Sequence, residues 1–318
     1  MTPRRDLRGL ALMLGAVVCF VVMSALVKIA REAGMGTAEV MVWRMAPGLP
    51  LVAIQMRRRG ISWLPRRPGA VLLRSVCGGL AMALYFWALD SLTLLQYSVI
   101  GLSQPVLVAM LAVPLLDERL RGSALAALPV ALAGAALVLL PDALVWRGDA
   151  SAVDTIPVLA GVVSLGSATF SALAHTFVRR ATGPHDPRGR PADAPETVVL
   201  AFSLVVTLGA LGVGLAQGQL RGPPPALSTV EALALLLPMA MIGMLGQLLL
   251  SAAYARGGAP HTAIVGYARI PLGLLADVLV WGAVAESSGL VGALLVFVAG
   301  ALLISDRQAD LRTPGPSP

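Results

Sequence analysis

Ten long apolar segments, separated by short segments rich in charged residues, glycine and proline, account for most of the sequence. Each segment is roughly 17–25 residues long, which is the length that an α-helix needs to cross the hydrocarbon core of a bilayer. The pattern therefore predicts an all-α membrane protein with ten transmembrane helices. The predicted spans are 9–30, 37–56, 69–89, 92–116, 122–140, 156–178, 197–216, 232–254, 260–281 and 288–304.

The composition supports a membrane protein and excludes several other classes. Of the 318 residues, 57% are hydrophobic and only 13% are charged, and the mean hydropathy is +0.81. Soluble globular proteins carry about 25% charged residues. These values exclude a soluble enzyme, a nucleic-acid-binding module and a disordered chain. The expected partner is therefore the lipid bilayer, and no nucleic acid is expected.

The basic residues predict how the chain is oriented. If the N-terminus is cytosolic, the inner segments carry 17 of the 24 Lys and Arg residues and the outer segments carry four. Cytoplasmic loops of membrane proteins show such an excess. We therefore predict a multi-pass protein of the inner (plasma) membrane with both termini in the cytosol, and with 57–68 and 179–195 on the cytosolic side. The second of these loops is rich in glycine and proline and is expected to be a flexible link.

The chain also divides into two similar halves. A shift of 166 residues aligns Pro105 with Pro271 and leaves five spans in each half, so the second half enters the membrane from the opposite side. Inverted repeats of this kind are common in secondary transporters. The expected domains are two inverted five-helix repeats, at 1–145 and 151–305, and a cytosolic tail at 306–318. The fifth and tenth spans lack charged residues and are expected to face lipid or a second subunit in a homodimer.

Arg269 is a candidate for a substrate-binding residue. It lies about 14 Å along its predicted span, close to the middle of the bilayer. A charge at that depth costs at least about 2.5–3.5 kcal/mol on insertion scales, so the side chain is expected to face a cavity or a partner. One interpretation is a clamp for a substrate carboxylate or phosphate. The other is a structural arginine bound to carbonyl groups at a helix end.

Two prolines mark the middle of the fourth and ninth spans. Because proline frees a backbone carbonyl and kinks a transmembrane helix, Pro105 and Pro271 are candidates for gating or coupling. Gln104 and Tyr267 lie close to them in the sequence and are candidates for substrate binding at a midplane site. The alternatives are kinked packing helices and, for Gln104, a hydrogen bond between helices.

Other polar residues within the spans leave two interpretations open. Arg44 is expected either to help shape the outer vestibule and the binding site or to extend toward the outer interface. Asp277 is either a proton-coupling carboxylate or a counter-charge at the outer interface. Because Asp277 lies eight residues from Arg269, the two are not expected to pair directly. Tyr85 and Gln247 are further candidates for lining the cavity.

Several short motifs resemble those of the EamA family of transporters. They are Trp43-Arg44, YFWAL at 85–89, LSQPV at 102–106, LDERL at 116–120 and YARIP at 267–271. The resemblance implies a ten-helix member of the drug/metabolite transporter (DMT) superfamily with both termini in the cytosol. The chain departs from the family pattern at Asp117, where a glycine usually precedes the glutamate. In the second repeat Val284 aligns with Glu118, and Glu286 follows two residues later.

These observations together predict a secondary transporter that moves a small polar metabolite, anionic or zwitterionic, across the inner membrane by alternating access. No nucleotide-binding loop is present, so direct ATP drive is not expected. The alternative is a membrane-embedded enzyme acting on a lipid or isoprenoid, which would need a metal or an acid–base cluster. The predicted spans contain no DxxxD or HxxxH pair, and Cys19 and Cys77 lie singly in apolar segments. We therefore expect no catalytic residue, no metal, no cofactor and no disulfide.

Overall fold

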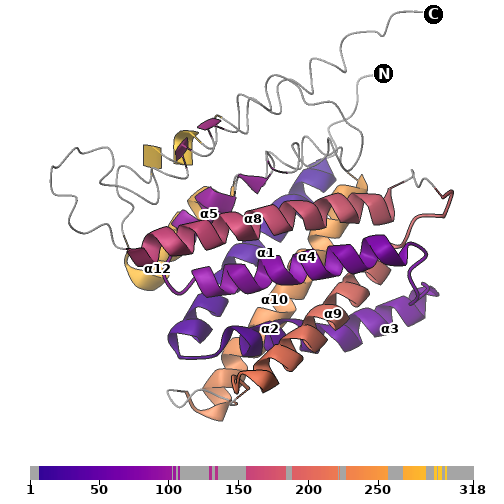
Figure 1. Ribbon diagram of the computed structural model, residues 1–318, viewed down its shortest axis with the longest axis horizontal. Helices are drawn as coiled ribbons and strands as arrows, with labels where there is room; N and C mark the ends of the chain where they lie inside the picture. Colours follow the sequence, from indigo (N-terminus) through magenta and orange to yellow (C-terminus); the bar gives the residue numbers. More distant parts are fainter. Residues whose placement is uncertain are drawn as a thin grey trace, which may run out of the picture.

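The computed structural model describes residues 7–101, 155–183, 188–220, 227–256 and 268–283, with isolated positions between 103 and 134, at 222, and between 290 and 298. Every element formed by these residues is helical, and they contain no β-strand (Figure 1). The elements are α1 (Leu7–Glu32), α2 (Thr37–Met45), η1 (Ala46–Gly48), α3 (Leu49–Arg59), α4 (Pro68–Ala88), α5 (Leu94–Gly101), α8 (Thr155–Thr182), α9 (Pro195–Ala216), α10 (Thr229–Arg256) and α12 (Arg269–Trp281).

Among the described residues, five helices are long and apolar enough to cross a bilayer, namely α1, α4, α8, α9 and α10. Their bounds agree with the predicted spans to within four residues. α5 and α12 correspond to parts of the fourth and ninth predicted spans, whereas most of 122–140 and 288–304 lies outside the described residues. The prediction of an all-helical protein with several membrane-spanning helices is therefore confirmed.

The second predicted span, 37–56, is helical but not continuous. A 3-10 turn at Ala46–Gly48 separates α2 from α3. The Ala-Pro-Gly-Leu-Pro sequence at this point explains the break, because proline lacks the N–H that an α-helical hydrogen bond requires and glycine weakens a helix. Gly48 also lets α10 approach closely, since a Cβ atom at this position would lie 2.2 Å from Cε of Met244.

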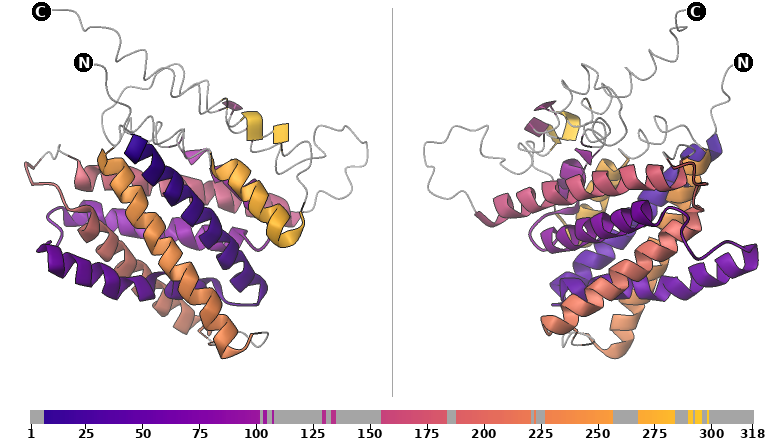
Figure 2. Two further views of the ribbon diagram at one scale, coloured as in Figure 1. Left: turned by 180° about the vertical axis from the view of Figure 1, so that it is seen from behind. Right: turned by 45° about the vertical axis from the view of Figure 1, so that its right-hand side comes forward.

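The helices pack as two closely associated pairs with further helices between them. α4 lies along α8, and α1 lies along α10 behind them, as Figures 1 and 2 show. α9 contacts α2, α3 and α4, and α12 contacts both α1 and α5. α12 belongs to the second half of the chain, whereas α1 and α5 belong to the first. The packing of α12 therefore brings the two halves into contact.

The apolar side chains divide between an interior cluster and an exposed surface. The largest core cluster lies among α1, α2, α4, α5, α9 and α10 and is rich in methionine. By contrast, Leu233, Leu237, Met241 and Leu245 form an exposed stripe along α10 at a spacing of four residues. A large exposed apolar surface is rare on soluble monomers, whereas lipid tails solvate it in a bilayer. The exterior of this helix is that of a membrane protein.

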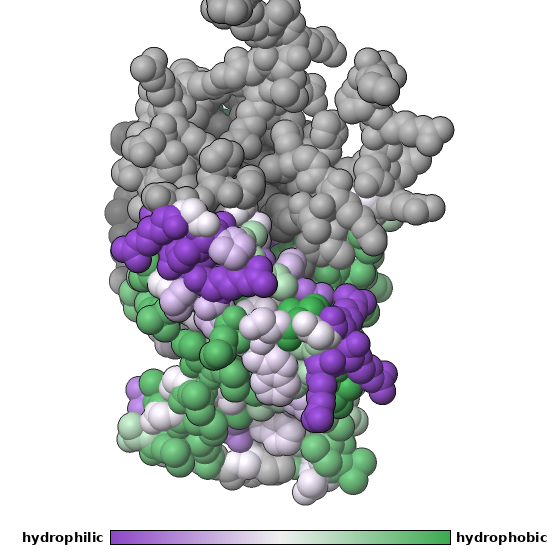
Figure 3. All heavy atoms as spheres, turned by 90° about the vertical axis from the view of Figure 1, so that its right-hand side faces the viewer, coloured by the Kyte–Doolittle hydropathy of each residue, from purple (hydrophilic) through white to green (hydrophobic). Residues whose placement is uncertain are grey.

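One end of the bundle holds the loop between α3 and α4 and the described part, 188–195, of the loop before α9. The Asp193 carboxylate joins them by accepting hydrogen bonds from the backbone N–H groups of Arg66 and Arg67, at 2.5 and 3.0 Å. Seen from this side, hydrophilic side chains gather beside apolar flanks (Figure 3). The described part of the expected link, 188–195, is therefore joined to this loop at Asp193.

Other contacts join the loops at the opposite end of the helices. Arg31 at the end of α1 forms an ion pair with Asp90 after α4. The backbone N–H of Ala38, at the start of α2, donates a hydrogen bond of 3.2 Å to Oε1 of Gln219, which follows α9. All of these residues belong to the segments, or border the segments, that the basic residues predict on the outer side. The contacts between loops thus agree with the predicted order of membrane crossings.

Cysteine labelling tests this order. In a variant with Cys19→Ala and Cys77→Ala, we expect Arg188→Cys and Gln217→Cys to react from opposite sides of the membrane, because they lie at opposite ends of α9. The measurement is modification by a membrane-impermeant maleimide in intact cells and in inverted vesicles. Ser62→Cys is the control expected to behave like Arg188→Cys. Labelling of positions 188 and 217 from the same side would contradict the arrangement.

Candidate functional site

Arg269, the first residue of α12, lies against two tyrosine rings from the first half of the chain. Its guanidinium carbon is 5.1 Å from the ring centre of Tyr97 on α5 and 5.8 Å from that of Tyr85 on α4. Its Nη2 atom donates a long hydrogen bond of 3.4 Å to the Tyr85 hydroxyl. The two rings stack on each other with their centres 3.8 Å apart. At these distances the guanidinium is attracted electrostatically to the ring faces.

Serines from two further helices hold the tyrosines in place. Ser24 on α1 is hydrogen-bonded to the Tyr85 hydroxyl. The Ser167 hydroxyl on α8 lies 3.4 Å from the Tyr97 hydroxyl and donates a hydrogen bond of 2.8 Å to the carbonyl of Ala81. Because a buried phenol hydroxyl needs a polar partner, these serines fix the orientation of the rings. Helices α1, α4, α5, α8 and α12 therefore all contribute to the surroundings of Arg269.

No carboxylate pairs with Arg269 within the part of the chain that the structure describes. The ion pairs formed there are Arg31–Asp90 and Arg59–Glu196. The space between Arg269 and the side chains of α1, α4 and α5 is too narrow to admit a water molecule in this conformation. Among the described residues, the contacts that stabilise this positive charge are the two ring faces and a tyrosine hydroxyl. Such a group can bind an anion once the helices move apart.

A second polar group lies nearer the start of α4. The guanidinium of Arg74 stacks over the ring of Phe202 at 4.1 Å, and its buried Nε atom has no hydrogen-bond partner.

The side-chain nitrogen of Gln104 lies 2.9 Å from Nδ1 of His175, which lies 2.7 Å from the Ser171 carbonyl. If Nδ1 donates to that carbonyl, the Gln104 amide must present its oxygen instead. The interhelical hydrogen bond that the sequence left open for Gln104 is therefore present.

Asp277 is buried, with 3% of its surface exposed, and caps α5 from α12. Its carboxylate oxygens accept hydrogen bonds from the backbone N–H groups of Leu94 and Leu95, at 3.0 and 2.7 Å. The first N–H groups of a helix have no partner within it, and a carboxylate there also interacts favourably with the positive end of the helix dipole. Asp277 is thus a helix cap supplied by a distant part of the chain rather than an exposed counter-charge.

Further contacts join α12 to α1 at the same end of the bundle. The Lys28 ammonium donates a hydrogen bond of 2.8 Å to the Leu92 carbonyl and lies 5.1 Å from the ring centre of Trp281. Nε1 of Trp281 donates a hydrogen bond of 3.0 Å to the Glu32 carboxylate. Together with Asp277, these contacts close the bundle between the two halves of the chain at the end predicted to lie outside.

Arg44 is buried at 3% exposure and does not extend to an interface. Its guanidinium donors face the sulfur atoms of Met23 and Met45, at 3.0 and 3.3 Å. A third contact of 3.4 Å reaches the carbonyl of Gly243 on α10. Thioether sulfur is a weak acceptor, so this arginine is held mainly by packing. The structure places it between α1, α2 and α10 and does not bring it to Arg269.

The remaining predicted residues are Gln247, Pro271, Tyr267 and Pro105. Gln247 is partly buried on α10. Pro271 lies in the first turn of α12 with its ring exposed. Proline is tolerated there because the first N–H groups of a helix have no acceptor within it, so Pro271 does not interrupt the described helix. Tyr267 and Pro105 lie outside the described residues.

The structure adds three residues that sequence reasoning did not place at a site. Arg74 carried a usable signal, because a charge within an apolar span is functional by default. Ser24 carried a weaker one, as the single polar residue in its apolar run. Ser167 carried none, since small hydroxyl residues are common in transmembrane helices. Only the packing of α8 against α4 and α5 shows its relation to Tyr97.

Comparisons with known proteins relate this chain to membrane transporters. Residues 7–140 match the EamA-like transporter family. The chain is 28% identical over 291 residues to the pseudopaline exporter CntI of Pseudomonas aeruginosa, across 92% of this chain and 94% of that protein. It is also 24% identical over 297 residues to an uncharacterized transporter of Helicobacter pylori, across 93% and 94% of the two chains. A crystal structure with 16% identity shares the fold, with a TM-score of 0.60 over 98% of this chain and 100% of that one.

The apolar helices of the described residues are those of a multi-pass membrane protein, and these matches make the chain similar to membrane transporters. Residues 7–140, which carry the motifs from Trp43-Arg44 to LDERL, are similar to the EamA-like transporter family. The family and the relatives bear the names of transporters, and none of these names denotes an enzyme.

Substitution of Asp277 tests its role as a helix cap. We expect Asp277→Ala to lower the free energy of unfolding of the purified protein by about 1–2 kcal/mol, because two buried N–H groups lose their acceptor. We expect a similar loss for Asp277→Asn, whose NH2 group would face one of these N–H groups. The measurement is thermal unfolding in detergent. A carboxylate that serves only proton coupling would give the opposite result, with unchanged stability and altered pH dependence of transport.

Proposed function

We propose that this protein exports a small anionic or zwitterionic metabolite across the inner membrane by alternating access, with Arg269 as the anion-binding residue. The observation that carries the proposal is the position of Arg269. It meets Tyr85 and Tyr97 where helices of both halves of the chain come together, and no described carboxylate neutralises it. Substrate sites of repeat-built transporters lie at such an interface near the bilayer midplane.

The chemistry of this cluster favours a substrate with a carboxylate or phosphate group. A guanidinium can donate two parallel hydrogen bonds to such a group, and this contact is strong in a site that excludes water. The Tyr85 hydroxyl donates to Ser24 and accepts from the guanidinium at 3.4 Å, so it helps to orient the guanidinium toward such a group. The tyrosine ring faces can also attract the ammonium group of a zwitterion. The site therefore suits amino-acid-like or organic-acid substrates better than neutral ones.

Closure of the bundle around Arg269 fits one stage of an alternating-access cycle. The space beside the guanidinium is too narrow for a substrate, so the helices must separate before binding. On the side predicted to be outer, Asp277, Trp281 and Lys28 join α12 to α5 and α1. Opening toward that side requires these contacts to break. We propose that the two halves, 1–145 and 151–305, move relative to each other as inverted five-helix repeats.

The direction and orientation follow from two separate arguments. The excess of Lys and Arg on one set of loops supports cytosolic termini in the inner membrane. The relative from Pseudomonas aeruginosa is named as an exporter, which supports outward movement of the substrate here. Uptake of a panel of amino acids, dipeptides and dicarboxylates into inverted vesicles tests direction and substrate class together. Accumulation only in right-side-out vesicles would contradict export.

Substitution of Arg269 tests its role in binding. We expect Arg269→Ala to lose about 10–100-fold in substrate affinity, because a charge-assisted contact of about 1.5–3 kcal/mol is removed. We expect Arg269→Lys to retain part of the affinity, since it keeps the charge without the planar fork. The measurement is transport per folded molecule in proteoliposomes, with a substrate found in the panel.

Arg44→Met is the matched control for Arg269→Ala, because it also removes an intramembrane arginine, but one whose hydrogen bonds reach Met23, Met45 and Gly243 rather than a tyrosine. We expect it to change the amount of folded protein without changing transport per molecule. A purely structural Arg269 would give this same pattern for Arg269→Ala. Normal transport per molecule in that variant would end the proposal that Arg269 binds the substrate.

Arg74 gives a second, independent prediction. Its buried Nε atom has no partner and its guanidinium faces Phe202, so we expect it to attract the substrate anion on its way from the cytosolic side. Arg74→Gln should raise the half-saturating substrate concentration about tenfold in inverted vesicles while leaving the maximal rate nearly unchanged. An unchanged half-saturating concentration, with less folded protein, would instead indicate a packing role.

A further inference from the structure

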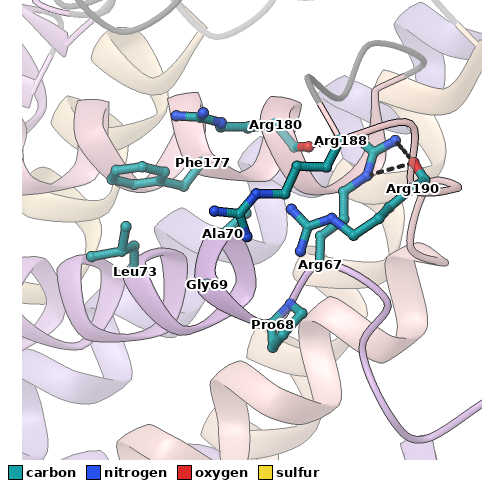
Figure 4. A pocket seen from close by; sticks show the side chains of 9 residues that line it. All are labelled: Arg67, Pro68, Gly69, Ala70, Leu73, Phe177, Arg180, Arg188 and Arg190. Atoms are coloured by element: carbon teal, nitrogen blue, oxygen red, sulfur yellow. Dashed lines mark hydrogen bonds between the residues drawn. The ribbon is translucent and has the colours of Figure 1, made fainter.

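A cavity of about 330 Å³ lies away from Arg269, between the first turn of α4, the end of α8 and the segment 188–190. Four arginines line it, namely Arg67, Arg180, Arg188 and Arg190. Figure 4 shows the side chains of Arg188 and Arg190 extending over the first turn of α4, with Arg180 on the α8 side. None of the described residues that line the cavity is acidic.

Backbone carbonyl groups hold the Arg67 guanidinium in a fixed position. It is 1% exposed, and its guanidinium donates hydrogen bonds to the carbonyls of Arg180 and Gly183, both at 2.8 Å, and of Arg190 at 2.6 Å. These carbonyl acceptors carry no net charge, so they hold the guanidinium without neutralising it. The nearby Asp193 carboxylate accepts hydrogen bonds from backbone N–H groups at 2.5 and 3.0 Å rather than from a guanidinium.

The start of α4 adds backbone N–H donors and partial positive charge to those of the arginines. The helix begins at Pro68, and no side chain caps its first turn. The N–H groups of the first turn have no acceptor within the helix, and the helix dipole places partial positive charge there. Gly69 has open space where a side chain would lie, so an anion can approach the backbone closely. The arginines and the helix start therefore favour the same ligand, a phosphate-like anion.

The other side of the cavity is apolar. Leu73 and Phe177 line it next to the arginines, as Figure 4 shows. Leu73 is 47% exposed and continues along α4 into the exposed side chains of Val76 and Leu80. These residues recur at helical spacing on a surface that faces lipid in a membrane. A ligand in this cavity can thus place a charged group among the arginines and an apolar chain along α4.

We propose that this cavity binds the phosphate headgroup of an anionic phospholipid, with its acyl chains along the exposed face of α4. The combination of four arginines with an adjoining lipid-facing stripe fits an amphipathic anion better than a free ion. Basic pockets between transmembrane helices on the cytoplasmic side bind anionic headgroups in this way. The bound lipid would bridge α4, α8 and the segment before α9, the same three parts that the Arg67 side chain joins through backbone carbonyls.

The test is native mass spectrometry of the full-length protein released from detergent micelles that contain a defined lipid. The probes are dioleoyl-phosphatidylglycerol, dioleoyl-phosphatidylcholine and inorganic phosphate. The test variant is the double substitution Arg180→Gln/Arg188→Gln, which keeps the backbone carbonyl that holds Arg67. The matched control is Arg57→Gln/Arg58→Gln, which removes the same charge from exposed positions at the same end of the bundle and outside the cavity.

We expect the unsubstituted protein and the control to retain phosphatidylglycerol in preference to phosphatidylcholine. We expect the cavity variant to bind phosphatidylglycerol roughly 10–30-fold more weakly, as the loss of two arginine–headgroup contacts implies. Arg180→Lys/Arg188→Lys should restore most of the binding, and this also shows that the site tolerates substitution. Equal binding by the cavity variant and the control would overturn the proposal. Binding of inorganic phosphate as tight as that of the phospholipid would overturn it in favour of a free anion.

Discussion

A cation that lies among apolar helices and pairs with no carboxylate of the described residues is the constraint around which this structure is arranged. Insertion of an arginine at the middle of a membrane costs at least about 2.5–3.5 kcal/mol, so its surroundings must return favourable contacts. For Arg269 these contacts are the ring faces of Tyr85 and Tyr97 and one phenol hydroxyl. Ser24 and Ser167 hold these rings in place. The surroundings of this guanidinium therefore depend on the positions of α1, α4, α5 and α8.

The chain stabilises its buried arginines with uncharged partners of several kinds. Arg74 lies over a phenylalanine ring, Arg44 lies against thioether sulfurs, and Arg67 donates to backbone carbonyls. A guanidinium suits each of these environments because it is planar, is more weakly hydrated than an ammonium and carries five donors. All but one of the 24 basic residues are arginine, and the single lysine, Lys28, lies near the end of α1. A carboxylate partner would neutralise these charges, whereas carbonyls and rings leave them able to bind an anion.

The sequence predicted the features that depend on local composition. Hydrophobic length identified the helices because each span must match the bilayer by itself, and Arg269 stood out because its charge interrupts such a span. Features that depend on distant contacts were not accessible. Asp277 caps α5 from 182 residues away, and no local pattern marks a helix cap supplied by another helix. The glycine and proline content of 188–195 likewise gave no sign of the hydrogen bonds that Asp193 and the Arg190 carbonyl form with the loop before α4.

The position of α12 links the candidate binding site to closure on the predicted outer side. The helix carries Arg269 at its first residue and Asp277 eight residues later, about 12 Å along its axis. Between them Gly273 permits a close approach to α5, since a Cβ atom there would lie 3.1 Å from the Ser98 hydroxyl and 3.3 Å from the Leu94 carbonyl. A short, regular helix moves as a rigid unit, so a displacement that frees the cap of α5 also shifts the guanidinium away from the tyrosines. In the proposed alternating-access cycle, opening of the outer contacts and rearrangement of the anion site are therefore one movement of α12, which is the coupling that transport requires.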